Sequence, residues 1–401
     1  MSLISPNSSL KINIIIFPQI SSEQLVTVFI NRVKEVNPYL NAVVEERYRA
    51  ATEDAKSIDR QIEEAKKNGT LEELVKDKPL FGVPFTVKES CSLAGLSNSV
   101  GCLENAGRRA TTDGGVVSLV KKAGAIPLLV SNTPELCLGW ETTNLLRGTT
   151  NNPYCMNRTP GGSSGGEAAL LACGASPFSV ASDIAGSIRL PAAFCGVFGH
   201  KPTPGVISIE GHIPTLSDSA FPKFLTVGPM TRKAEDLPLL MSIMAGPDNK
   251  LNLNEPVDMN TVKVGKLFLW LGLLTLSINS VEISVSVFFS MKDIPNLLQD
   301  PANPKVSAAK RNKVLGDNGV LIYPVFIGQA HHHNEVFFKA SGVMYTMAFN
   351  ILGMPATTVP MGLYKGLPVG VQVIAAPKQD RLCLAVAKQL EAGFGGWKPP
   401  Q

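Results

Sequence analysis

The fold of this chain is decided by a glycine- and serine-rich stretch, Pro160-Gly161-Gly162-Ser163-Ser164-Gly165-Gly166. A second loop of the same kind follows it, Ser182-Asp183-Ile184-Ala185-Gly186-Ser187. The residues between the two loops predict a helix over 167–173 and a strand over 177–181. Because glycine allows a positive φ and a close approach of the backbone to a ligand, each loop can hold a serine beside exposed backbone N–H groups.

Ser187 is the first candidate for a catalytic residue. The run 183–187 can turn several successive backbone N–H groups toward one point, and fixed donors of this kind stabilise the oxyanion of a tetrahedral intermediate. We therefore expect Ser187 to be a nucleophile that lies within its own oxyanion hole. Asp183 and Arg189 flank it, and we expect them to pair with each other and so to fix the loop.

A nucleophilic serine needs a base, and histidine is the usual one. The chain has five histidines, and none has a local context that marks it as a triad member. Lys88 is a better candidate because it ends an apolar, strand-like run, Gly82-Val83-Pro84-Phe85-Thr86-Val87-Lys88. Burial disfavours the charged form of a lysine. An uncharged Lys88 would take a proton from Ser163, which in turn takes one from Ser187.

Strands and helices alternate along most of the chain. This alternation predicts an α/β fold with a mixed, mostly parallel sheet that is covered by helices on both faces. Further strands are predicted over residues 81–88, 125–130, 226–232, 319–325, 356–362 and 370–375. Helices are predicted over a highly charged stretch at 46–67 and over 234–245, 342–352 and 380–393. Another helix should follow the capping box at Ser21-Ser22-Glu23-Gln24, and another should run from a cap at Thr112-Asp113 to Lys122. A short helix should start at 133–135.

The composition is that of a globular protein, because 44% of the 401 residues are hydrophobic and 17% are charged. The net charge of +4 is small and scattered, so we expect neither a nucleic-acid partner nor a polybasic membrane patch. The seven cysteines form no CxxC pair, which favours reduced thiols and an intracellular protein. The apolar run 11–17 is too short to span a membrane.

Several other patterns have an ordinary structural explanation that we prefer. Residues 161–165 match the nucleophile elbow G-x-S-x-G, but that motif directly follows a strand, whereas 151–160 has the composition of a loop. The stretch 118–121 matches S-x-x-K, yet the chain has no K-T-G. No G-K-[ST] of a phosphate-binding loop follows the glycines. The run 331–333 is three histidines without acidic partners, so we expect a solvated loop and no metal site.

The segment after Asp248 is less regular than the rest. Residues 266–291 are barely long enough to span a membrane and contain Asn279 and Glu282. We therefore favour buried strands or a hairpin for this segment over a transmembrane helix.

Three motifs together resemble the amidase signature family. They are Gly-Val-Pro-x-x-Val-Lys-Glu at 82–89, Gly-Gly-Ser-Ser-Gly-Gly-Glu at 161–167 and Ser-Asp-Ile-x-Gly-Ser-Ile-Arg-x-Pro at 182–191. The surrounding residues are similar to the type-two fatty-acid amide hydrolases. The resemblance implies amide hydrolysis by a Ser-Ser-Lys triad, in which Ser187 is the nucleophile, Ser163 the bridging serine and Lys88 the base.

The resemblance also implies the surroundings of this triad. The oxyanion donors would be the backbone N–H groups of Ile184, Ala185, Gly186 and Ser187, and no metal or organic cofactor is needed. The peptide bond between Gly162 and Ser163 would be cis, and supporting roles fall to Gly162, Ser164, Asp183 and Arg189. The implied substrates are small-molecule amides, above all fatty-acid amides, and the implied location is inside the cell with peripheral membrane contact. Nothing in the sequence indicates an oligomeric state.

The sequence departs from this family in two places. We expect one amidase domain over 1–401, with a signature core at about 80–248 and a C-terminal part at 313–397, but the segment at about 250–312 is shorter than the family's. In the fatty-acid amide hydrolases this longer section shapes the acyl channel and the membrane-facing cap, so its loss here would imply a cytoplasmic protein. Ala185 stands where the family most often has glycine. Two alternatives stay open: a catalytically impaired remnant that binds a lipid or a partner, and an amidase for non-lipid amides.

Overall fold

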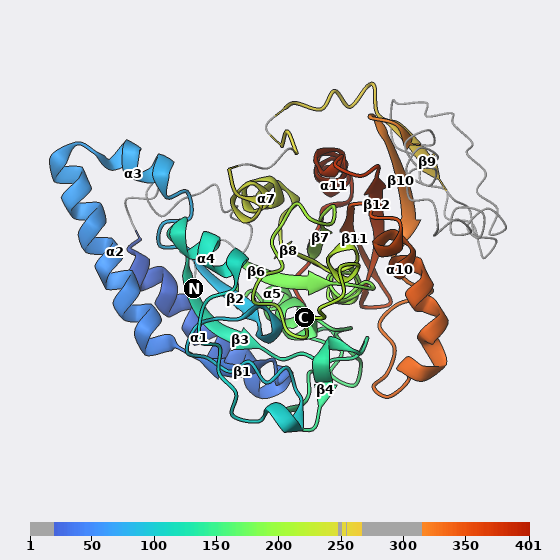
Figure 1. Ribbon diagram of the computed structural model, residues 1–401, viewed down its shortest axis with the longest axis horizontal. Coiled ribbons are helices and arrows are strands. Elements are labelled where there is room, and N and C mark those ends of the chain that lie inside the picture. The colour runs from blue at the N-terminus through green and yellow to red at the C-terminus, as the bar shows by residue number, and fades with distance from the viewer. Residues whose placement is uncertain (1–19, 248–250, 254, 267–314) are drawn as a thin grey trace.

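The structure is a computed structural model that describes residues 20–247, 251–253, 255–266 and 315–401. Within these residues ten strands form one sheet in the order β1-β3-β2-β6-β8-β7-β11-β12-β10-β9 (Figure 1). The strands are β1 (Val43–Glu46), β2 (Pro84–Lys88), β3 (Ile126–Ser131), β6 (Phe178–Asp183), β7 (Phe198–Lys201), β8 (Thr226–Thr231), β9 (Lys263–Lys266), β10 (Gly319–Pro324), β11 (Ala356–Tyr364) and β12 (Leu367–Ala375). A separate small sheet pairs β4 (Thr143–Asn144) with β5 (Gly148–Thr149).

The sheet is mixed, as predicted, but the prediction that it is mostly parallel is wrong. Parallel pairs join β2 to β3 and to β6, and β10 to β9. The other neighbours pair antiparallel: β1 with β3, β6 with β8, β8 with β7, β7 with β11, β11 with β12 and β12 with β10. The alternation of helix and strand did not show that β8, which follows β7 after a long loop, returns to lie between β6 and β7.

Helices cover both faces of the sheet, which confirms that part of the prediction (Figure 1). The apolar residues of α4 (Gly115–Lys122), α7 (Leu237–Ala245) and α11 (Asp380–Phe394) share a core with one face. The other face packs against α1 (Ser22–Leu40), α2 (Tyr48–Asn68), α5 (Gly165–Ala172), α6 (Arg189–Phe194) and α10 (Met344–Ile351). A further short helix, α3 (Leu71–Asp77), follows α2.

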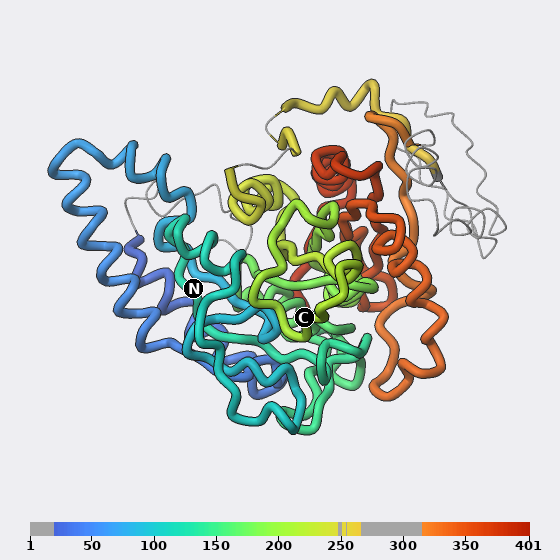
Figure 2. The backbone as a smooth tube through the Cα atoms, in the orientation of Figure 1, coloured from blue at the N-terminus to red at the C-terminus, as the bar shows by residue number. Residues whose placement is uncertain are grey.

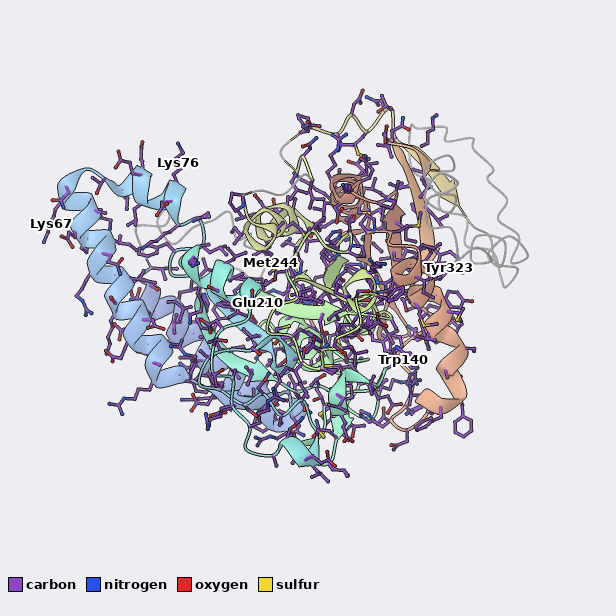
Figure 3. All side chains as sticks on the ribbon, in the orientation of Figure 1. Lys67, Lys76, Trp140, Glu210, Met244 and Tyr323 are labelled. Atoms are coloured by element: carbon purple, nitrogen blue, oxygen red, sulfur yellow. The ribbon has the colours of Figure 1, made fainter. Side chains whose placement is uncertain are left out.

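Local signals in the sequence mark two of the helix ends. Ser21 and Gln24 form the predicted capping box at the start of α1. The charged helix α2 ends at Gly69, whose φ of 70° is the left-handed conformation that terminates many helices. Lys67 and Lys76 point away from the molecule at the tip of α2 and α3 (Figure 3), so this helix pair presents a solvated, charged surface.

Among the boundaries that differ from the predictions, two helix starts have a clear cause. The helix predicted from residue 46 begins at Tyr48, because Val43–Glu46 pairs with β3 instead. The predicted cap at Thr112-Asp113 is also wrong, because α4 has Gly114 as its N-cap. The Asp113 carboxylate accepts hydrogen bonds from the Ala94 N–H and from Lys121. The segment 266–291, for which strands or a hairpin were predicted, lies almost entirely outside the described residues.

The two glycine- and serine-rich loops lie at the centre of the molecule. The backbone from 150 to 200 runs through the middle, between the N-terminal part and the C-terminal part (Figure 2). The strand pair β2 and β6 is parallel, so the ends of both strands meet at the same edge of the sheet. Functional groups gather at the carboxyl ends of neighbouring parallel strands, and this edge holds Lys88 and Ser182.

Candidate active site

Lys88 is the last residue of β2, and its side chain is completely buried. Because successive side chains of a strand point to opposite faces, Phe85 and Val87 enter the core shared with α4 and α7, whereas Thr86 and Lys88 point toward the start of α5. The Lys88 amine lies 2.6 Å from the hydroxyl of Ser163 and 3.0 Å from that of Ser182. The position expected for Lys88, in the interior beside Ser163, is confirmed.

Ser163 lies in the bend that leads into α5. The peptide bond between Gly162 and Ser163 is cis, as the resemblance implied. The carbonyl of Ser163 accepts a hydrogen bond from the Thr133 hydroxyl at 3.0 Å. A Cβ at position 162 would lie 2.5 Å from the carbonyl oxygen of Gly139, so only glycine fits there. The backbone therefore holds the Ser163 hydroxyl in front of Lys88.

Ser187 lies in the second loop, and 4% of its surface is exposed. Its carbonyl accepts a hydrogen bond from the Ser164 N–H at 3.1 Å, so the two loops are joined directly. Gly186 has a φ of 109°, and a Cβ there would lie 2.2 Å from the hydroxyl of Thr346. Only glycine satisfies both conditions, which explains why this residue precedes the serine.

The backbone N–H groups of the second loop divide into two sets. Gly186 donates to the Asp183 carboxylate at 2.8 Å, and Ile188 donates to the same carboxylate at 3.0 Å. The N–H groups of Ile184, Ala185 and Ser187 make no hydrogen bond to any other described residue. Ile184 and Ala185 are also partly exposed. Three of the four predicted oxyanion donors are thus available to a ligand, and that of Gly186 is already used.

Asp183 and Arg189 form the predicted ion pair, with 2.9 Å between carboxylate and guanidinium and with both side chains completely buried. Burial alone would raise the pKa of Asp183, but the Arg189 guanidinium and the Gly186 N–H outweigh it and hold this pKa well below its usual range. A buried charge needs a partner for each of its polar atoms. Arg189 meets this need with further hydrogen bonds to the Thr346 carbonyl, Gln372 and Asn350.

Sequence reasoning missed these distant partners. Asn350 and Gln372 lie far along the chain from Arg189, on α10 and β12. A signal did exist for Gln372, because it interrupts the apolar strand pattern Val371-Gln372-Val373 and is completely buried. A polar residue in such a run needs a buried partner. The partner itself cannot be found from the sequence, because Arg189 and Gln372 are 183 positions apart along the chain.

Glu167 is a second buried acid near Lys88. It lies in the first turn of α5 and accepts a hydrogen bond from the Thr86 hydroxyl. Burial raises its pKa to about 7, although hydrogen bonds and the charge of Lys88 act in the opposite direction. Its other carboxyl oxygen has no hydrogen-bond partner among the described residues, which agrees with the raised pKa because an unpaired buried charge is unfavourable.

No histidine in the described part of the chain is hydrogen-bonded to Ser163 or Ser187, but one contacts Ser182. His200 contacts the Thr357 hydroxyl at 2.8 Å and Asp380 at 3.1 Å, but all three side chains are completely buried. His212 contacts the Ser182 hydroxyl at 2.9 Å. The prediction of a solvated loop at 331–333 is wrong for His331, which is buried beside Glu141 at 3.4 Å. No group of three or more His, Cys, Asp or Glu in the described part of the chain could hold a metal ion.

The amidase family model matches residues 24–266 and 297–384 of this chain. The chain belongs to the amidase family. It is therefore an amide hydrolase. The fatty-acid amide hydrolase 2-A of Danio rerio is 36% identical over 95% of this chain and 87% of its own length. The human fatty-acid amide hydrolase 2 is 35% identical over 94% of this chain and 86% of its own length.

The fold of this amidase is also that of solved structures. A fatty acid amide hydrolase superposes with a TM-score of 0.80 at 19% identity, over 98% of this chain and 86% of the other. The alignment with the Danio rerio relative spans 473 positions against the 401 residues of this chain, so the relative has residues without a counterpart here. None of the described helices is both long and apolar enough to cross a membrane.

Proposed function

We propose that this amidase cleaves its substrates through an acyl-enzyme formed on Ser187, with Ser163 and Lys88 completing a Ser-Ser-Lys triad. The observation that carries the proposal is the buried contact of 2.6 Å between the Lys88 amine and the Ser163 hydroxyl. A lysine without a carboxylate partner at this distance from a serine fits a proton acceptor better than an ion pair. The hydrogen bond between Ser164 and Ser187 supports the second half of the triad.

Acylation begins when the Ser187 oxygen attacks the carbonyl carbon of the amide. The Ser187 proton passes to the Ser163 oxygen, while the Ser163 proton passes to the Lys88 amine. The carbonyl π electrons become an oxyanion, which the N–H groups of Ile184, Ala185 and Ser187 stabilise. The intermediate collapses when the C–N bond breaks and the departing nitrogen takes a proton from Ser163, which Lys88 replenishes. Water then attacks the ester by the same proton route and releases the carboxylic acid.

We infer that fatty-acid amides are the preferred substrate class. The names of the relatives support this inference, and so does an apolar surface beside the nucleophile loop. Phe337, Phe338 and Met344 are 85%, 87% and 47% exposed. They lie in the 3-10 helix Val336–Val343 and at the start of α10, and Thr346 of α10 donates a hydrogen bond to the Ala185 carbonyl. This continuous segment presents apolar surface that suits an acyl chain, and it suits peripheral contact with a membrane.

We also propose that the whole chain is one domain. Strands from both sides of the shortened segment at about 250–312 belong to the same sheet, and β9, which lies within that segment, pairs with β10. β10 in turn pairs with β12, and β11 with β7 of the signature core. The shared sheet supports a single cooperative unit in which the shorter connection leaves the catalytic core complete.

The test is labelling with a fluorophosphonate probe followed by peptide mapping. We expect the label on Ser187, and we expect a long-chain fatty-acid amide to be hydrolysed faster than a short-chain or aryl amide. A folded protein that does not react would favour the alternative, an impaired amidase-like protein that binds a lipid or a partner. A faster reaction with short or aryl amides would overturn only the substrate class.

A further inference from the structure

Two buried groups next to Lys88 have no role in the reaction described above. They are Ser182, the penultimate residue of β6, and His212, which lies in the long loop between β7 and β8; their exposed fractions are 2% and 4%. The Ser182 hydroxyl lies 3.0 Å from the Lys88 amine and 2.9 Å from Nε2 of His212. Lys88, Ser182 and His212 therefore form a continuous chain of hydrogen bonds inside the protein.

The direction of each hydrogen bond in this chain is determined by its far end. Nδ1 of His212 lies 2.9 Å from the Pro214 carbonyl oxygen, which can only accept, so Nδ1 carries the proton. Burial is the main cause that lowers the pKa of His212, and it acts even when Lys88 is uncharged, so the imidazole is neutral and Nε2 is an acceptor. Ser182 must donate its one proton to Nε2, and its oxygen can only accept from Lys88.

This direction decides where the lone pair of an uncharged Lys88 points. The amine has two N–H groups, and two acceptors are offered to it by one residue: the hydroxyl oxygen of Ser182 at 3.0 Å and its carbonyl oxygen at 3.5 Å. The third neighbour is the Ser163 hydroxyl at 2.6 Å. With both N–H groups directed at Ser182, the nitrogen lone pair is left for the proton of Ser163.

We propose that His212 is a positioning residue that acts through Ser182 to keep the Lys88 lone pair available to Ser163. Without the imidazole, the Ser182 hydroxyl is free to rotate and to donate its own proton to Lys88, in competition with Ser163. The inference rests on the proposed function, because it assigns a partner to the base of that mechanism. The inference also goes beyond the triad, because it assigns the direction of proton transfer to His212, a residue outside the three motifs.

Other groups near Lys88 do not replace His212 in this role. The Ser90 hydroxyl lies 3.4 Å from that of Ser182 and can only donate to it, because the Ser182 proton is already used. Burial raises the pKa of Cys91 to about 12, so its thiol stays neutral. Glu167 bonds to Thr86 and is not among the hydrogen-bond partners of the Lys88 amine or of Ser182. In the described residues, His212 is the acceptor that holds the Ser182 proton.

A double-mutant cycle tests the inference. We expect His212→Phe to lower kcat for a fatty-acid amide by about tenfold with little change in KM, the effect of roughly one hydrogen bond. Ser182→Ala should lower kcat by a similar factor. Because His212 acts only through Ser182, adding His212→Phe to Ser182→Ala should cause no further loss. Equal losses from His212→Phe in both backgrounds, or an unchanged kcat in folded His212→Phe, would overturn the proposal.

Conservative variants and a control separate positioning from a general structural effect. His212→Gln places an amide oxygen near the position of Nε2 and keeps the acceptor, so it should recover most of kcat, and Ser182→Thr should do the same. His332 is exposed, and its ring contacts the Asn157 carbonyl and none of Lys88, Ser182 or His212, so the control variant His332→Phe should leave kcat unchanged. Thermal unfolding of each variant identifies any that fail to fold.

An NMR experiment judges the inference even if Ser187 never forms an acyl-enzyme. In protein labelled with ¹⁵N-histidine, the His212 ring should show a protonated Nδ1 and an unprotonated, hydrogen-bonded Nε2. Ser182→Ala should shift the Nε2 signal, and Ser182→Thr should restore it. Absent acylation together with this shift would reject the proposed function alone. A signal that does not respond to Ser182→Ala would overturn the hydrogen-bond chain itself.

Discussion

Two parts of this molecule combine a hydroxyl with a buried basic group, and only one of them has the features of an active site. In the first, Thr357, His200 and Asp380 follow one another in the familiar order of hydroxyl, imidazole and carboxylate. In the second, Lys88 contacts Ser163 on a loop that is bonded to the loop of Ser187. In the second set, neither a histidine nor a carboxylate is hydrogen-bonded to the hydroxyl of Ser163 or Ser187 in the described residues.

The difference lies in access and in unused donors. Thr357, His200 and Asp380 have no exposed surface, and Asp380 also accepts hydrogen bonds from the backbone and side chain of Thr203. Ser187 lies beside the partly exposed Ile184 and Ala185, whose N–H groups have no partner among the described residues. Of the two sets, only the second therefore offers unused donors next to partly exposed surface, which favours it as the proposed site. The types of the three side chains alone would have favoured the first set.

The largest expected effect is that of Ser187→Ala. Loss of the nucleophile should lower amide hydrolysis by a factor of about 10⁴ or more, because the proposed acyl-enzyme forms on Ser187. The matched change in the buried set, Thr357→Val, should leave the rate per folded molecule unchanged. Rates of hydrolysis and of fluorophosphonate labelling measure both. Activity that depends on Thr357 and survives Ser187→Ala would reverse the comparison.

Replacement of the proposed base should have the next largest effect. Lys88→Met keeps most of the side-chain volume but removes the proton acceptor, so acylation at neutral pH should slow by about 10²–10⁴. His200→Gln serves as the control in the buried set and should alter stability without altering acylation. Stopped-flow measurement of single-turnover acylation gives the rate directly. An unchanged rate in Lys88→Met would remove Lys88 from the mechanism.

The ion pair behind the nucleophile loop should affect stability. Arg189→Met leaves the buried Asp183 carboxylate without its partner and should lower the free energy of unfolding by about 3–5 kcal/mol. Because the folded protein lowers the pKa of Asp183, its stabilising effect is present above the ordinary value of 3.8 and is lost as the pH falls below it. Urea unfolding at about pH 7 and about pH 2.5 measures both effects, and the Arg189→Met variant should lose less stability on acidification.

An exposed pair provides the control for this prediction. Lys66 and Glu63 lie 2.8 Å apart on α2, with side chains 42% and 63% exposed. Lys66→Met should therefore cause no measurable loss of stability, because water screens such pairs. Similar losses from Arg189→Met and Lys66→Met would mean that Asp183 does not depend on Arg189 in solution.

Glu167 should show the smallest effect, confined to the pH dependence of stability. Folding raises its pKa from 4.5 to about 7, so its contribution is complete below 4.5 and is lost as the pH rises through 7. Glu167→Gln cannot ionise and should avoid this loss, which amounts to about 3 kcal/mol at most. Urea unfolding should show the variant gaining relative to the parent between pH 5 and pH 8. A constant difference between the two proteins would show that Glu167 does not titrate in this range.

Much of this site could be predicted from the sequence because its parts are short and local. Ser163 and Ser187 each lie among glycines, and Lys88 ends an apolar run, so the motif positions were visible in stretches of a few residues. The pair formed by Asp183 and Arg189 could also be predicted, because the two residues belong to one loop. In each case the backbone conformation of a short segment determines the position of the group.

Strand direction and the partners of the buried groups required the tertiary structure. β8 pairs antiparallel between β6 and β7, and no local pattern of apolar residues encodes which strand a segment will join. The contacts of Arg189 with Asn350 and Gln372, and of Ser182 with His212, likewise join segments that are distant in sequence. The sequence by itself therefore determined which residues can act and which short loops carry them. Only the tertiary structure decided which buried groups face one another, because that depends on how the whole chain packs.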